Sequence, residues 1–262
     1  MTKTSMKRTH RFLIEKFKEN GQVVDLSDDL MHYASRVLRL ANGSEIQAWN
    51  GQGQVFPARI DYLSKKQAQV TSIGTALSLP PTELLRPLYI AQALPEADKM
   101  DWVLEKCTEM GAKGFIPIQA ERSVVKLNGP RAEKKHQHWQ KVIASAAVQS
   151  ERQIMPELFP VHTAQAGLEL IEKWGNKPHS LFCTPDATGH LDDWALSQKQ
   201  TNSDRPVVIW VGPEGGWSPG EIDLATQWGA LKLRMCPRIL RTETFGLACL
   251  SRLTMGLGIE PI

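Results

Sequence analysis

A fully apolar five-residue run that leads straight into a glycine-rich loop constrains the fold of this chain more than any other segment. The run covers residues 207–211 (VVIWV), and the loop covers residues 212–216 (GPEGG). A strand that is apolar on both faces is typical of a parallel sheet covered by helices. Ser218, Pro219 and Glu221 then form a helix-start pattern with a capping serine. The segment therefore predicts a strand, a loop and a helix of an α/β domain.

The chain after residue 77 repeats this alternation. Residues 77–87 (LSLPPTELLRP) hold three prolines, which remove backbone donors and favour a linker. Strands are expected at residues 88–93, 115–118, 181–183 and 231–235, and helices near residues 100–111, 139–146, from about 219 and from about 242. This alternation predicts a parallel sheet with helices packed on it.

Residues 10–75 have a different pattern, with short strand-like runs joined by turns. The runs cover residues 23–26, 46–49, 55–60 and 68–73, and one short helix is expected at residues 31–40. Asn50-Gly51 is a hairpin turn signal. Several short strands in one stretch predict a small β-barrel. We therefore expect two domains, a barrel over residues 1–76 and an α/β domain over residues 77–262.

Composition narrows the class of protein. Hydrophobic residues make up 42% of the chain and charged residues 23%, an ordinary globular balance. No apolar run approaches the roughly 20 residues that cross a bilayer, and the basic N-terminal stretch lacks the apolar core of a secretory signal. We therefore expect a cytoplasmic protein outside the membrane. The cysteines are widely spaced, so we expect neither a metal site nor a disulfide framework.

Positive charge is concentrated at the N-terminus, where residues 1–20 hold six basic and two acidic side chains. Such an arm can contact phosphate groups, or it can be a solvated tail that aids solubility. Charge alone leaves both interpretations open.

The glycine loop is a candidate ligand site. Ligands of open parallel sheets bind beyond the carboxyl ends of the strands, and glycines let the backbone approach a ligand closely. The loop carries neither a GxGxxG pattern nor a GK[ST] ending, so contacts to phosphates are less important. An adenosine with an amino-acid tail fits this description, and a tight connection without a ligand is the alternative. Trp217, directly after the loop, is a candidate base-stacking side chain, although tryptophans are more often core residues.

A second charged segment, residues 235–250 (MCPRILRTETFGLACL), follows another expected strand. The pair GPEGG and LRTET resembles the SPOUT methyltransferase superfamily, and specifically the RsmE family of ribosomal RNA uridine-N3 methyltransferases. The resemblance extends, in order, to residues 32–40 (HYASRVLRL), 99–123 and 146–158, and thus to nearly the whole chain.

The resemblance implies the fold, the cofactor and the assembly. The first domain would be a PUA-like barrel that contacts RNA, and the second an α/β domain with a trefoil knot at its C-terminal end. The family acts as a homodimer and uses S-adenosylmethionine, which would lie in the knot. The residues that the resemblance assigns to the cofactor are Thr184, Gly212, Pro213, Glu214, Gly215, Gly216, Ile239, Leu240 and Thr242.

Methylation of a uridine at N3, in 16S ribosomal RNA or in the assembled small subunit, requires that the N3 proton leave. We expect Arg241 to stabilise negative charge on the base and Glu243 to orient the base or accept the proton. Glu214 is an alternative polar contact, and the sequence does not separate the two carboxylates. Candidates for RNA backbone contacts are Arg8, Arg11, Arg36 and Arg39. The last two lie three positions apart and should share a helix face.

Departures from the family pattern occur at Val148, Phe245 and Gly246, and they leave the cofactor loops intact. Three alternatives remain. The same fold could act on another RNA or on a ribose hydroxyl. A non-catalytic RNA-binding assembly factor could keep the fold, although intact GPEGG and LRTET segments count against it. A small-molecule enzyme could use the glycine loop for a nucleotide, but the added barrel and basic arm make this less attractive.

Overall fold

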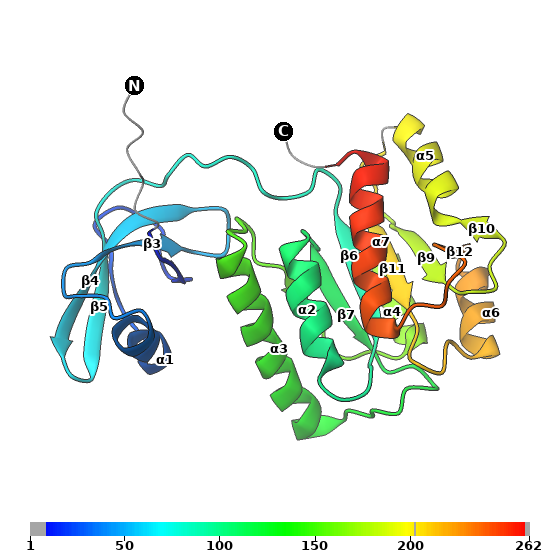
Figure 1. The fold of residues 1–262 in the computed structure, drawn as a ribbon, viewed down its shortest axis with the longest axis horizontal. Helices are drawn as coiled ribbons and strands as arrows, with labels where there is room; N and C mark the ends of the chain where they lie inside the picture. The colour runs from blue at the N-terminus through cyan, green and yellow to red at the C-terminus, as the bar shows by residue number, and fades with distance from the viewer. Residues whose placement is uncertain (1–8, 202, 260–262) are drawn as a thin grey trace. The chain divides into compact units, whose positions relative to one another are not determined.

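The computed structural model describes residues 9–201 and 203–259, so the predicted RNA contact Arg8 lies outside the described residues. The chain divides into two units (Figure 1). Unit 1 runs up to Pro81 and includes a later segment, Glu151–Met155. Unit 2 consists of Thr82–Ser150 and of the chain from Pro156 onward.

Unit 1 is built on a five-stranded sheet with the order β1-β3-β4-β5-β2. The strands are β1 (Arg11–Leu13), β2 (Val23–Asp25), β3 (Glu45–Trp49), β4 (Val55–Ser64) and β5 (Gln67–Ser72). β1 pairs with β3 in parallel, and the other pairs are antiparallel. Alternating side chains of these strands, such as Phe12, Ile46 and Ile60, meet in one buried cluster. This confirms the small β-domain.

The expected helix at residues 31–40 is divided differently in the structure. An α-helical turn, α1 (Asp28–His32), continues into a π-helical turn, η1 (Tyr33–Val37). Arg36 lies in η1, whereas Arg39 follows it with a left-handed φ of 53°. The prediction that these two arginines share a helix face is therefore wrong. The wider π-turn and the end of the helix before Arg39 remove the spacing on which that prediction depended.

Unit 2 contains a seven-stranded sheet with the order β10-β12-β9-β11-β6-β7-β8, and every pair in it is parallel. The strands are β6 (Leu88–Ala93), β7 (Gly114–Ile118), β8 (Glu157–Leu158), β9 (His179–Cys183), β10 (Gly189–His190), β11 (Val207–Val211) and β12 (Leu231–Arg234). β11 lies in the middle of the sheet and is buried along its whole length, as its apolar sequence predicts. The expected α/β class is confirmed.

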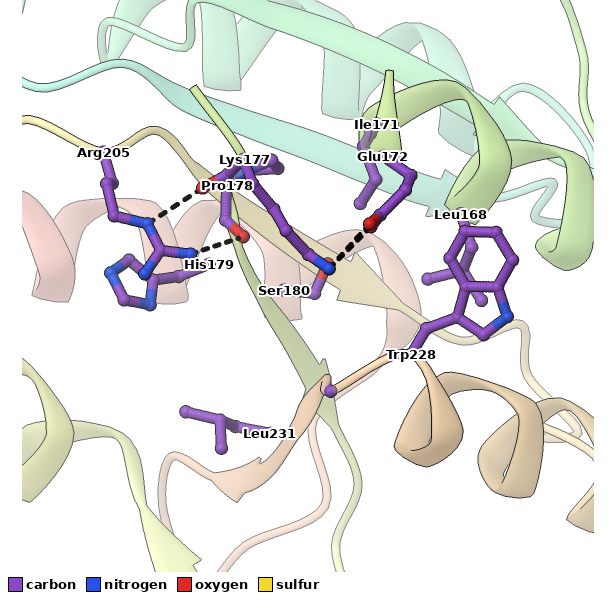
Figure 2. A pocket seen from close by; sticks show the side chains of 11 residues that line it. Leu168, Ile171, Glu172, Lys177, Pro178, His179, Ser180, Arg205, Trp228 and Leu231 are labelled. Atoms are coloured by element: carbon purple, nitrogen blue, oxygen red, sulfur yellow. Dashed lines mark hydrogen bonds and ion pairs between the residues drawn. The ribbon is translucent and has the colours of Figure 1, made fainter. Parts of the chain in front are cut away.

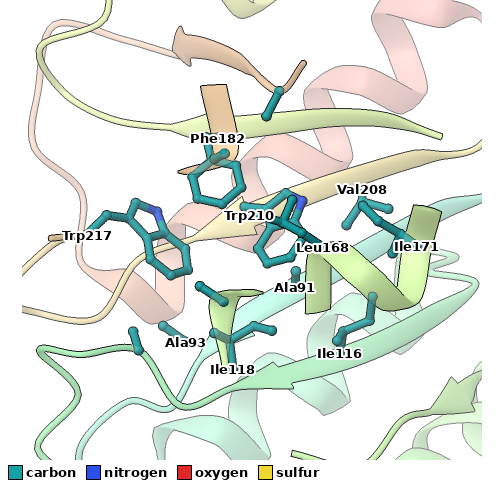
Figure 3. Packing of buried hydrophobic residues seen from close by; sticks show 14 of the residues in the cluster. Ala91, Ala93, Ile116, Ile118, Leu168, Ile171, Phe182, Val208, Trp210 and Trp217 are labelled. Atoms are coloured by element: carbon teal, nitrogen blue, oxygen red, sulfur yellow. The ribbon is translucent and has the colours of Figure 1, made fainter. Parts of the chain in front are cut away.

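Six helices of the described chain belong to this unit. They are α2 (Lys99–Glu109), α3 (Gly129–Gln149), α4 (Ala164–Glu172), α5 (Leu191–Thr201), α6 (Pro219–Gln227) and α7 (Thr242–Leu257). α2 packs against α3 and α7, and α7 also contacts α5, β6 and β11. α4 contacts α6 and β7. Figure 3 shows Leu168 of α4 beside Trp210, whose ring stacks on that of Phe182, within the buried cluster that holds α4 to the sheet.

Three neighbouring strands determine where a ligand can bind. β9, β11 and β12 run parallel, so the loops that follow them leave from the same edge of the sheet. In sequence these loops begin after Cys183, Val211 and Arg234. The carboxyl edge of a parallel sheet is the usual ligand position in this class of fold.

Candidate active site

A cavity of about 570 Å³ lies at this edge of the sheet. It is lined by three chain segments that follow β9, β11 and β12, and by one side chain from the start of α2. Of the predicted cofactor and catalytic residues, the cavity is lined by Thr184, Gly212, Pro213, Glu214, Gly216, Ile239, Leu240, Arg241, Thr242 and Glu243. The structure thus brings together residues that lie up to 59 positions apart in the sequence.

The glycine loop turns sharply at Gly216, which has a left-handed φ of +68°. Its N–H donates to the carbonyl of Pro213 at 2.8 Å, which closes the turn. Space around Gly216 is open, because an added Cβ would meet no described atom within 4 Å. The loop backbone is therefore accessible to a ligand at this point.

Gly215 does not line the cavity. Its carbonyl accepts a hydrogen bond from Arg122 Nη1 at 3.2 Å, and the same nitrogen donates to the carbonyl of Trp217 at 3.3 Å. An added Cβ at Gly215 would lie 3.3 Å from Arg122 Cβ. Arg122, which the sequence did not single out, thus supports the loop from outside the cavity.

Trp217 is a core residue that also lines the cavity. Its ring lies 5.0 Å from that of Phe182 and 6.4 Å from that of Trp210, and it is only 5% exposed. An added Cβ at Gly212 would lie 3.2 Å from the indole Nε1, so the glycine allows the loop to lie against the ring. Burial on this scale favours a packing role over base stacking.

The helix start after the loop has the predicted capping box. Ser218 Oγ accepts from the N–H of Glu221 at 3.2 Å, and Glu221 Oε2 accepts from the N–H of Ser218 at 2.9 Å. The second oxygen of Glu221 accepts from the N–H of Glu121 at 3.0 Å. One buried carboxylate therefore joins α6 to the segment after β7 and fixes the far end of the glycine loop.

Thr242 joins α7 to the loop. Its hydroxyl donates to the carbonyl of Gly212 at 2.6 Å and accepts from Gln92 Nε2 at 2.9 Å. Gln92 is fully buried in β6, opposite Val211 of β11. Gln92 was not predicted, although an amide in the otherwise apolar strand LYIAQA is an unusual residue that requires a buried partner.

Lys99, the first residue of α2, was also missed. Its Nζ donates to Glu214 Oε1 at 2.7 Å and lies 3.9 Å from Glu243 Oε2. A cation at a helix N-terminus is disfavoured by the helix dipole, and this was a local signal that could have been used. The ammonium therefore connects the two acidic residues that the sequence could not separate.

The two carboxylates have different surroundings. Glu214 Oε1 also accepts from the N–H of Glu96 at 3.2 Å. Burial raises the pKa of Glu214, but the hydrogen bonds from Lys99 and from backbone N–H groups outweigh burial and hold that pKa below its usual value. Glu243 Oε2, by contrast, is buried and accepts no hydrogen bond from any described residue.

Two further polar groups line the cavity. Thr184 is 6% exposed, and its Oγ1 has no hydrogen-bond partner within the described chain. Arg241 is the N-cap residue of α7 and is exposed, and it makes no side-chain cap hydrogen bond. Ile239 adds an apolar surface that is 84% exposed. These groups are available to a bound molecule.

The predicted RNA contacts that the structure describes all lie in unit 1. Arg36 and Arg39 are exposed. Arg11 is partly buried in β1, where its Nη1 donates to the carbonyl of Arg152 at 3.1 Å. Burial lowers the pKa of Arg11, and Glu151 partly offsets this. Arg11 therefore helps to hold the segment Glu151–Met155 within unit 1.

No group of three or more His, Cys, Asp or Glu side chains in residues 9–201 and 203–259 is placed to hold a metal ion. In the same residues, no helix is long and apolar enough to cross a membrane.

Comparisons with known proteins agree with this arrangement. Residues 82–254 match the model of an RNA methyltransferase domain, and residues 26–71 match that of an RNA methyltransferase PUA domain. The chain is 31% identical to ribosomal RNA small subunit methyltransferase E of Bacillus subtilis, over 93% of this chain and 95% of that protein. It is 32% identical to the protein of the same name from Synechocystis, over 88% of this chain and 72% of that protein.

Solved structures show the same fold. Ribosomal RNA small subunit methyltransferase E from Neisseria gonorrhoeae, bound to S-adenosyl methionine, has a TM-score of 0.82 at 29% identity and covers 94% of this chain and 97% of its own. A methyltransferase from Legionella pneumophila, in complex with the same cofactor, has a TM-score of 0.84 at 29% identity and covers 95% of this chain and 98% of its own.

Proposed function

The chain belongs to the ribosomal RNA small subunit methyltransferase E family, and we propose that it methylates N3 of a uridine in the small-subunit RNA. It is an S-adenosylmethionine-dependent methyltransferase of ribosomal RNA. One observation carries the finer assignment of N3. The cavity holds an acidic side chain, Glu243, whose Oε2 accepts no hydrogen bond from the described residues, next to an exposed guanidinium, Arg241.

The cavity fits the cofactor. Thr184 Oγ1 lacks a partner among the described residues, and the backbone is open at Gly216, so both can meet a polar ligand. Ile239 offers apolar surface to the adenosyl group. The residues that would hold the cofactor are Thr184, Gly212, Pro213, Gly216, Ile239 and Leu240, with Thr242 fixing the loop. When bound, S-adenosylmethionine supplies an electrophilic methyl group on a sulfonium.

The reaction at N3 needs a base and a counter-charge. Loss of the N3 proton to the base leaves an anion on the uracil, and a cation is needed to stabilise it. The N3 lone pair of this anion then takes the methyl group, which leaves a neutral thioether in place of the sulfonium. Glu243 is placed to accept the proton, since it lines the cavity and its Oε2 accepts no hydrogen bond from the described residues. Arg241 is placed to face the negative charge on the uracil oxygens.

Glu214 has another role. Its carboxylate is bound by Lys99 and by the N–H of Glu96, and the lowered pKa makes it a poor proton acceptor. It ties the glycine loop to the start of α2. Lys99 holds Glu214 and lies near Glu243, so it positions both acidic residues relative to the loop.

The remaining parts of the assignment concern substrate and assembly. Arg36 and Arg39 are exposed on unit 1 and can contact RNA phosphates without sharing a helix face. The protein acts in the cytoplasm as a homodimer on ribosomal RNA or on the assembled subunit. The ranges 1–76 and 77–262 remain our proposal for the RNA-binding barrel and the catalytic domain.

The test is methyl transfer to small-subunit RNA followed by nucleoside mass spectrometry. We expect 3-methyluridine as the product. Glu243→Gln and Arg241→Ala should each lower turnover by about 100-fold or more, the usual size of a proton-transfer or charge-stabilising contribution, and leave cofactor affinity within a few-fold. Asp223→Asn, an exposed acidic residue of α6, is the matched control.

Two outcomes would contradict the proposal. A product methylated on the ribose or on another base would reject the assignment of N3, and would favour the same fold with another target. Full turnover of Glu243→Gln, together with a large loss in Glu214→Gln, would exchange the roles of the two carboxylates.

A further inference from the structure

A second cavity of about 250 Å³ lies at the amino edge of the same sheet. β9 connects the two cavities, because His179 and Ser180 line this one and Cys183 lines the active site. A strand of five residues spans roughly 16 Å, so the two cavities are separate. Its lining includes Leu168, Ile171, Lys177, Arg205, Trp228 and Leu231.

One wall of this cavity is apolar and carries an aromatic ring. Leu168 and Ile171 come from α4, Trp228 follows α6, and Leu231 begins β12. Figure 2 shows the indole of Trp228 beside Leu168, on the other side of the cavity from Arg205. Trp228 is only partly buried, so part of its ring is available for stacking.

The opposite wall is cationic. Arg205 Nε donates to the carbonyl of Lys177 at 2.9 Å, and its Nη2 donates to that of Pro178 at 3.5 Å. These bonds orient the guanidinium, which has five donors in all, and leave others free. Lys177 Nζ lies 2.7 Å from Glu172 Oε2, so that pair is neutral and the positive charge of Arg205 remains.

A second arginine increases this positive charge. Arg86 is 3% exposed, and its Nε donates to the carbonyl of Arg205 at 2.6 Å. Arg86 Nη2 and His179 Nε2 are both buried without a hydrogen-bond partner in the described residues. No carboxylate forms an ion pair with Arg86 or Arg205 within those residues. Asp204 attracts the Arg86 guanidinium, but burial and the charge of Arg205 outweigh it and lower the pKa of Arg86. The two arginines therefore keep an excess of positive charge, which favours an anion supplied from outside the chain.

We propose that this second cavity binds a nucleotide, with its phosphate on the guanidinium of Arg205 and its base against Trp228. The two walls offer what such a ligand needs, since a phosphate takes several guanidinium donors and every nucleobase has a face that stacks on indole. The nucleotide is either free in solution or part of an RNA chain, and the chemistry of the site is the same in both cases.

The experiment measures binding of uridine 5′-monophosphate to the full-length protein by calorimetry. Arg205→Gln and Trp228→Leu should each weaken binding by at least about fivefold, the lower end expected for one base-stacking contact. Arg131→Gln, an exposed arginine of α3 outside both cavities, should leave the affinity unchanged. Thermal unfolding of each variant checks that the fold is retained.

Further ligands identify the source of the nucleotide. If a short oligouridylate displaces the monophosphate from the wild-type protein and fails to bind Arg205→Gln, the nucleotide comes from RNA. If only the monophosphate binds, the site takes a free nucleotide. The proposal is overturned if the monophosphate does not bind, or if both variants bind it as tightly as wild type. Saturating S-adenosylmethionine should have no effect, which keeps this test independent of the active site.

Discussion

Replacing Thr242 by valine should loosen the glycine loop without changing the shape of the core. Valine has nearly the same volume as threonine, but it removes the hydroxyl that donates to the carbonyl of Gly212 and accepts from Gln92. The Gly212 carbonyl loses its 2.6 Å bond, whereas Gln92 Nε2 keeps a bond to the carbonyl of Ala93 at 3.0 Å. A buried acceptor without a partner costs about 1–3 kcal/mol, and this carbonyl is only partly buried, so we expect the lower half of that range.

This cost should appear mainly in cofactor binding. The bond connects the two segments that surround the cavity, so its loss makes the loop less ordered in the free protein. If about 1.4 kcal/mol of the penalty falls on binding, S-adenosylmethionine should bind about tenfold more weakly. Calorimetric titration measures the affinity, and chemical denaturation without ligand measures the remainder of the penalty. Gln92→Leu should change affinity in the same direction.

Thr254→Val is a matched control, because Thr254 lies in the same helix and is 1% exposed. Its hydroxyl donates at 2.9 Å to the carbonyl of Leu250, one turn earlier, and so makes no contact with the loop. We expect Thr254→Val to leave cofactor affinity unchanged. If Thr242→Val binds the cofactor as tightly as this control, the hydroxyl does not hold the loop and the reasoning is refuted.

Three shorter predictions concern charge and backbone. Because the pKa of Glu214 is lowered, its ionised form stabilises the fold above the ordinary glutamate pKa, and this contribution is lost as the pH falls through the lowered value. In Lys99→Met, the free energy of unfolding in urea should therefore fall less between pH 7 and pH 3 than in the wild-type protein. Burial and the charges of Arg205 and Arg86 lower the pKa of His179 to about 4, so stability should fall as the pH drops from about 6.5 towards 4, and less so in His179→Gln. Gly216→Ala should lower stability by about 1–2 kcal/mol, because alanine disfavours a φ of +68°.

The strands of unit 2 were predicted well where local sequence alone determines them. Residues 207–211 form β11 with the predicted bounds, because a run of apolar residues between Pro206 and a glycine leaves few other structures. In unit 1, by contrast, β1 has only three residues and depends on pairing with β3, so no local pattern indicates it. The helices α4 and α5 were not predicted.

Only part of the candidate site was predicted, again because local sequence determines some of its segments and strand pairing determines others. The loop after β11 and the start of α7 have recognisable sequences, so most of their residues were assigned in advance. Gln92 enters the site only because β6 pairs with β11 in a register that places Gln92 opposite Val211. Pairing between strands more than 100 positions apart cannot be read from one sequence.

The residues that were missed nevertheless share a property that is visible in the sequence. Gln92 is an amide inside an apolar strand, and Lys99 is a cation at the start of a helix, where the dipole disfavours it. Each is unfavourable locally and becomes favourable through a partner at the cavity, Thr242 for the amide and Glu214 for the ammonium. Local preference and global structure agree along most of a natural chain, so positions where they conflict are expected at functional sites. In this chain both conflicts, an amide in an apolar strand and a cation at a helix start, lie next to the cavity.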